Sequence, residues 1–161
     1  MTTPDVNEYL RTKVMTASPA ELRLMLIDGA IRFAGQAREG LLANDHEKIY
    51  QGSTQCRAIL TELITSLQPE VAPLLCERLA ALYAFIYNEM VSAVSHRDPG
   101  GVDKVVELLA YDRETWVLAI ERLAAQGAQN EEAGQCPADF AADPTDEAGD
   151  TMAGGNLNLS G

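Results

Sequence analysis

Histidine and cysteine, the residues most used in metal and nucleophilic sites, are scarce in this chain of 161 residues. A di-iron centre in a helical bundle needs paired Glu-x-x-His motifs, and neither His46 nor His96 follows a glutamate by three residues. Both histidines fall at expected helix ends. The glycine pairs Gly100-Gly101 and Gly154-Gly155 follow no expected strand, as a phosphate-binding loop would. We therefore expect no metal, no cofactor and no enzymatic activity.

The three cysteines are Cys56, Cys76 and Cys136, an odd count without C-x-x-C spacing. Cys56 and Cys76 fall within apolar stripes, which favours small core residues. Reduced thiols of this kind fit a cytoplasmic protein better than a disulfide framework. The first residues also lack the basic and apolar regions of a signal peptide.

Basic residues are few: 12 Lys and Arg stand against 24 Asp and Glu, which gives a formal net charge of -12. Such a chain is repelled by nucleic acid and by anionic lipid, so neither is expected as a partner. No run approaches the roughly 18 apolar residues that span a bilayer, and we expect no membrane insertion.

Helix signals, in contrast, are abundant. Ser18 is placed as an N-cap, Pro19 as the first helical residue and Glu21 as the third, and together they form a capping box. An apolar stripe follows at once, and predicts a helix over 19–43. Asn44 and Asp45 end this helix and cap the next.

Three further helices are expected, over 46–67, 73–95 and from Pro99 or Val102 to 126. The second has the most regular period, with Ile49, Cys56 and Leu63 one heptad apart. Four amphipathic segments with short connections favour an all-α fold, an antiparallel four-helix bundle over residues 19–126.

Two flanking segments complete the chain. Residues 1–18 form an N-terminal arm without a helix signal of its own. Residues 127–161 hold seven acids, no Lys or Arg and six glycines. Such a segment buries too little apolar surface to offset its ordering entropy, so we expect a disordered acidic tail.

Three blocks of the chain resemble one family. They are Tyr9 and Val14 followed by Thr16-Ala17-Ser18-Pro19 and a Leu-rich helix; Leu82-Tyr83-Ala84-Phe85-Ile86-Tyr87; and Val105-Val106-Glu107-Leu108-Leu109 with Arg113-Glu114-Thr115-Trp116. The pattern is similar to the flagellin-specific export chaperones of the bacterial flagellum. It covers about residues 6–123. Asp112 departs from it, because the family usually has an apolar residue there; either the helix is rotated locally or Asp112 lies at a solvated groove edge.

The resemblance implies a cytoplasmic chaperone that binds the C-terminal region of flagellin and prevents its polymerisation before export to the type III apparatus. It also implies that the arm folds back over the bundle, where Tyr9 and Val14 cover the client groove or touch the export gate. We expect a monomer or weak homodimer when the protein is free.

The aromatic residues exceed what a plain bundle needs. We expect Phe85 and Trp116 in the core, and Tyr50, Tyr83 and Tyr87 in an outward groove, because a tyrosine offers an apolar face and a polar tip. The full set of expected partner-binding residues is Tyr9, Leu10, Val14, Leu22, Met25, Tyr50, Tyr83 and Tyr87.

Two alternatives stay open at this point. One is a helical-bundle enzyme with an unusual carboxylate metal site. The other is a scaffold bundle that associates with itself through its apolar faces.

Overall fold

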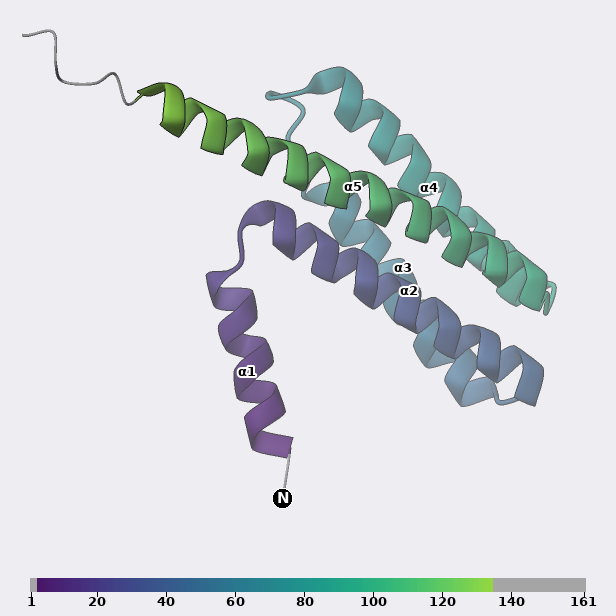
Figure 1. Cartoon of the computed structure of the whole chain (residues 1–161). Helices are drawn as coiled ribbons and strands as arrows, with labels where there is room; N and C mark the ends of the chain where they lie inside the picture. Colours follow the sequence, from purple (N-terminus) through teal and green to yellow (C-terminus); the bar gives the residue numbers. More distant parts are fainter. Residues whose placement is uncertain (1–2, 135–161) are drawn as a thin grey trace, which may run out of the picture.

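The computed structural model of the protein describes residues 3–134 of the chain (Figure 1). All regular elements in this range are helices: α1 (Thr3–Thr16), α2 (Pro19–Ala43), α3 (His46–Thr65), α4 (Pro73–Ser95) and α5 (Pro99–Gly134). None of these described helices is both long and apolar enough to cross a bilayer.

Helices α2 to α5 form an antiparallel four-helix bundle, as expected from the sequence (Figure 1). α2 packs between α3 and α5, and α4 packs against the same two helices from the opposite side. Each helix thus has two neighbours and one diagonal partner, so a single core runs along the bundle axis.

The start of α2 is fixed by the capping box that the sequence indicates. The Glu21 N–H donates to Ser18 Oγ at 3.2 Å, and the Ser18 N–H donates to Glu21 Oε2 at 2.7 Å. Pro19 occupies the first turn. These two bonds satisfy backbone groups that a helix start leaves open, and so define where the bundle begins.

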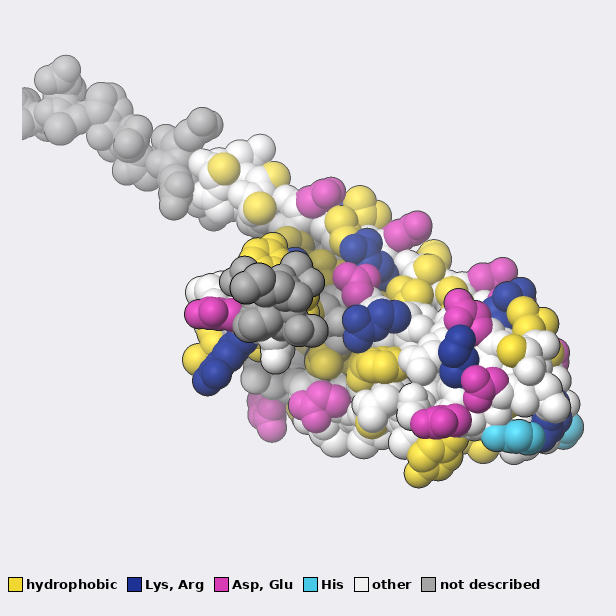
Figure 2. All heavy atoms as spheres, turned by 90° about the horizontal axis from the view of Figure 1, so that it is seen from below, with side chains coloured by type: hydrophobic (Ala, Val, Ile, Leu, Met, Phe, Trp, Pro, Cys, Tyr) yellow, Lys and Arg dark blue, Asp and Glu magenta, His cyan; other side chains and the backbone are white. Residues whose placement is uncertain are grey.

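The α2–α3 and α4–α5 turns lie at the far end of the bundle. Asn44 is left-handed with φ 53°, and Asp45 accepts from the N–H groups of Glu47 and Lys48. Asp98 accepts from the Gly100 N–H at 2.9 Å, so α5 begins at Pro99 and is not delayed to Val102. The histidine side chains lie at this same end, away from α1 (Figure 2).

The core between α2 and α3 is built from small residues. Ala30, Ala34 and Ala37 of α2 are fully buried against the α3 seam of Cys56, Leu60 and Leu63. Gly52 lets the two backbones meet, because a Cβ at this position would lie 2.5 Å from the Ala37 nitrogen. The heptad seam expected on α3 is therefore confirmed. Because Cys56 lies in this seam, burial raises the pKa of its thiol to about 12.

Three element boundaries differ from the expected ones. The N-terminal arm, for which we expected no helix, forms the helix α1. α3 ends at Thr65 and not at residue 67, with Ser66 as its C-cap. α5 continues past residue 126 to Gly134, but residues 121–129 are exposed, so this extension contributes little to the core. We expected disorder over residues 127–161. Residues 127–134 are helical as the end of α5, which corrects that part of the expectation, and residues 135–161 lie outside the described residues.

Candidate functional site

A hollow opens at the end of the bundle where α2 starts and α3 ends. It has a volume of about 520 Å³, and we call it the end groove. α2, α4, the end of α3 and the segment 66–72 line it, and α5 contributes the ring of Trp116. Its described lining residues are Pro19, Ala20, Leu22, Arg23, Leu26, Glu62, Ser66, Leu67, Gln68, Val71, Ala72, Leu75, Cys76, Leu79 and Trp116.

The local sequence explains why this end stays open. The segment 66–72 connects α3 to α4, and Pro69 and Pro73 keep it from extending either helix. It carries Val71 to the surface, where 78% of this residue is exposed, and Leu75 in the first turns of α4 is 53% exposed. Apolar side chains therefore rim the groove as well as line it.

A buried polar cluster lies beneath the groove, formed by Tyr83, Asp112, Trp116 and Arg23. The Tyr83 hydroxyl donates to Asp112 Oδ2 at 2.8 Å, and both residues are buried. Burial, together with the Asp112 charge, raises the pKa of Tyr83 to about 12. Burial also raises the pKa of Asp112, an effect that the Tyr83 hydrogen bond and the Arg23 charge partly oppose.

This geometry corrects the expectation for Tyr83 and for Asp112. Tyr83 is fully buried and does not face an outward groove. Asp112 lies in the core, where it accepts the Tyr83 hydroxyl, and not at a solvated edge. The expected core position of Phe85 is also wrong, because 45% of that residue is exposed, with Lys104 Nζ 5.2 Å from its ring centroid. Trp116 is partly buried against the core, close to what we expected.

The remaining expected site residues do not converge. Leu22 lines the end groove. Met25 lines a separate hollow of about 350 Å³ between the end of α1, α2 and Arg113 of α5. Tyr50 is 70% exposed near the far turns, and Tyr87 is half-buried beneath the Arg57 guanidinium.

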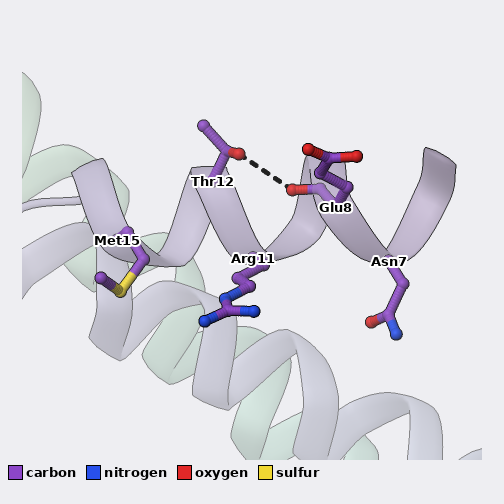
Figure 3. Close-up of a pocket in the computed structure, with 5 residues that line it drawn as sticks. All are labelled: Asn7, Glu8, Arg11, Thr12 and Met15. Carbon is purple, nitrogen blue, oxygen red and sulfur yellow. Dashed lines mark hydrogen bonds between the residues drawn. The ribbon is translucent and has the colours of Figure 1, made fainter. Parts of the chain in front are cut away.

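The arm does not cover the groove in this structure. α1 leaves the bundle at an angle to α2 (Figure 1), and Tyr9, Leu10 and Val14 are all exposed, Tyr9 by 66%. A further hollow lies along α1, and its described lining residues all come from that helix. Figure 3 shows them, with the Thr12 hydroxyl donating to the Glu8 carbonyl at 2.9 Å. The side chains are mostly polar, so this hollow is a poor place for an apolar segment.

The sequence carries a signal for the groove at the connection between α3 and α4. The apolar residues Val71, Leu74 and Leu75 lie beside Pro69 and Pro73, in or just after the connection from α3 to α4. At this position the four helices do not enclose their side chains in the core. A hydrophobic cluster at such a place is typical of a binding surface. The face in Figure 2 shows other hydrophobic groups separated by charged side chains.

The described residues also bear on catalysis. No three His, Cys, Asp or Glu side chains among residues 3–134 are grouped so that they could hold a metal ion. The Cys56 thiol is fully buried and its pKa is raised by that burial, which disfavours the reactive thiolate at neutral pH. What the end groove offers is apolar contact area with one guanidinium, that of Arg23, and one carboxylate, that of Glu62, which suits binding.

Comparison with known proteins agrees with this reading. A family model described as "Flagellar protein FliS" matches residues 2–123. The curated protein "Flagellar secretion chaperone FliS" of Bacillus subtilis (strain 168) is 28% identical to the chain over 113 residues, which cover 70% of this chain and 84% of that protein. Because the family model matches well over half of the sequence, and the fold is the expected helical bundle, the chain belongs to the FliS family of flagellar proteins.

Proposed function

We propose that the protein is a cytoplasmic export chaperone that binds the C-terminal region of flagellin. Binding masks the surfaces through which flagellin polymerises and delivers the client to the flagellar type III export apparatus. The action is stoichiometric and involves no catalysis. The support comes from family membership and from the end groove, an apolar hollow large enough for side chains of an amphipathic segment.

The observation that carries the proposal is the apolar rim of the groove. A monomeric protein seldom leaves a cluster such as Val71, Leu74 and Leu75 exposed beside a hollow unless it binds something there. A client segment that is disordered when free loses entropy on ordering, so the contact area must be sizeable. The groove can supply part of that area, and the exposed apolar residues of α1 can supply more.

In this proposal α1 takes part through Tyr9, Leu10 and Val14. Their exposure leaves them available to contact the client or the export apparatus. The chain's surplus of acids keeps nucleic acid and anionic lipid from competing.

The test is binding of a C-terminal flagellin fragment from the same organism, measured by calorimetry and by size exclusion after co-expression. Leu75→Glu places a charge on the groove rim and should weaken binding by about tenfold or more. Leu42→Glu is the matched control, since Leu42 is an exposed leucine on α2 near the far turns. Equal binding by both variants would contradict the groove as the site.

Sedimentation separates this proposal from a self-associating scaffold. The chaperone should form a defined complex with the fragment. A scaffold would form a stable oligomer whose mass does not change when the fragment is added.

A further inference from the structure

Arg23 is the single cation among the described residues that line the end groove. Its guanidinium carbon lies 5.1 Å from the centroid of the Trp116 ring, and Nη2 donates to Ser66 Oγ at 3.1 Å. The Ser66 hydroxyl in turn donates to the Leu63 carbonyl at 3.2 Å. A stacked ring on one side and a hydroxyl at the edge hold the planar group in the groove wall.

The guanidinium has donors that find no acceptor. Arg23 Nη1 is buried and makes no hydrogen bond to any described residue. Arg23 is also absent from the four ion pairs within the described residues, which involve Arg38, Lys48, Lys104 and Arg113. The Arg23 guanidinium is near enough to Asp112 and Tyr83 to oppose the rise in the pKa of both, but the Asp112 carboxylate accepts the Tyr83 hydroxyl and is not among the ion pairs of the described residues. A buried cationic donor without an acceptor is unfavourable, and any ligand that supplies the acceptor removes that penalty.

We infer that Arg23 is the specificity anchor of the end groove and that it binds a carboxylate side chain carried by the apolar segment of the client. The inference rests on the proposed function and adds to it the chemistry of the bound segment: apolar residues with one Asp or Glu among them. A carboxylate matches the guanidinium because it can accept two parallel N–H bonds. Nη1 is buried in this structure, so the guanidinium has to turn toward the groove to form both bonds. An amide or an apolar side chain at the same place leaves the guanidinium unsatisfied, and this difference provides the discrimination.

Glu62 is the competing acceptor. It lines the same groove from α3, but it is exposed and forms no ion pair with Arg23 in this structure. If the Glu62 carboxylate paired with Arg23 in the complex, Glu62 would belong to the binding surface, and removing its charge would weaken client binding. If the client supplies the carboxylate, removing the charge of Glu62 removes a repulsion between two carboxylates and does not weaken binding.

The experiment is calorimetry of the full chain with a C-terminal flagellin fragment in which each acidic residue is changed in turn to its amide. The protein variants are Arg23→Gln, Arg23→Lys, Glu62→Gln and, as a control of equal charge change, Arg78→Gln. Arg78 is exposed on α4 and does not line the groove. The stability of each variant is measured by thermal melts. Arg23→Lys keeps the positive charge, so it remains informative if Arg23→Gln lowers the stability of the chain.

We expect one acidic position of the fragment to lose about 10- to 100-fold in affinity for the wild-type chain when it becomes an amide. The same change should have no further effect on Arg23→Gln. For Arg23→Lys, the loss of affinity caused by the amide change should be smaller than for the wild type and larger than for Arg23→Gln. Arg78→Gln should bind like the wild type.

Three results overturn the inference. The first is that each amide variant of the fragment loses the same affinity for the Arg23→Gln chain as for the wild-type chain. Another is a loss with Glu62→Gln as large as that with Arg23→Gln, which would make Glu62 the partner of Arg23. A wild-type chain that binds no fragment at all overturns the proposed function, and the carboxylate site with it; in the first two cases binding itself persists, and the proposed function stands.

Discussion

The Tyr83 hydroxyl and the Asp112 carboxylate, 29 residues apart in the sequence, form a 2.8 Å hydrogen bond inside the core and join α4 to α5. Tyr83→Phe removes the donor and leaves a buried carboxylate with one acceptor site empty. We expect the free energy of unfolding at neutral pH to fall by about 1–3 kcal/mol, measured by denaturant unfolding. Changing both residues to apolar ones, as in Tyr83→Phe with Asp112→Leu, should recover part of this loss. A Tyr83→Phe variant as stable as the wild type would mean that the bond contributes nothing.

The same pair predicts a pH dependence. Burial raises the pKa of Asp112 above its ordinary value of 3.8. Below about 3.8 the carboxyl is protonated in both the folded and the unfolded chain, so it imposes no charge penalty. As the pH rises through the folded-state pKa, the charge must form inside the core, and stability is lost.

Asp112→Asn removes that penalty and keeps an oxygen for the Tyr83 hydroxyl. We expect the stability of Asp112→Asn relative to the wild type to increase as the pH rises from about 3.5 to about 7. The measurement is a series of denaturant melts over this range, with Glu107→Gln on the exposed side of α5 as the control for net charge. A relative stability that is constant with pH, or that changes in the opposite direction, would contradict a raised Asp112 pKa.

Gly52 and Gly35 provide a matched pair of glycines inside helices. At Gly52 a Cβ would lie 2.5 Å from the Ala37 nitrogen and 2.6 Å from the Phe33 carbonyl oxygen, and both are backbone atoms that cannot move alone. Gly52→Ala should therefore destabilise the bundle by about 1–3 kcal/mol, in spite of the better helix propensity of alanine.

At Gly35 a Cβ would meet nothing within 4 Å. Gly35→Ala should raise stability by up to about 1 kcal/mol, because only the propensity difference acts. Thermal and denaturant melts of both variants test this contrast. Similar effects at the two positions would show that α2 and α3 do not approach at Gly52 as described.

Deletion of residues 1–15 tests the position of α1. The apolar residues of this helix are exposed, so their removal takes little buried surface from the bundle. We expect a melting temperature within about 2 °C of the full chain. A clear fall would show that α1 packs against the bundle in solution, as the folded-back arm would.

Local signals and periodicity account for what the sequence predicted well. The Ser18 capping box, the left-handed Asn44 and the heptad seam of α3 each depend on residues within one or two turns of each other. The helix signal of the arm was also local: Pro4 and Asp5 fall in the first turn of α1 and Lys13 in its last. Val6, Tyr9, Leu10 and Val14 follow these signals at helical spacing, so the periodicity of α1 was also present in the sequence.

The site depended on contacts that a local pattern does not contain. Tyr83 and Phe85 are both aromatic and two residues apart, and their polarity suggested that the tyrosine faces water. The structure reverses this, because Asp112, on another helix, satisfies the Tyr83 hydroxyl inside the core. The end groove likewise combines residues from α2, α3, α4 and α5, so its lining could be assembled only after the helices were placed.

The two ends of the bundle differ in how firmly they are joined. At the far end, Arg97 Nη1 donates to Asn44 Oδ1 at 2.6 Å and ties one turn to the other, while Gly40 and Gly101 let neighbouring atoms approach closely. At the groove end, α4 starts at Pro73 after the irregular segment 66–72, and its N-cap residue Ala72 makes no side-chain cap hydrogen bond. Local opening should therefore require less free energy at the groove end. Under the proposed function, a bound segment would be accommodated by local opening at the groove end, while the far turns keep their geometry.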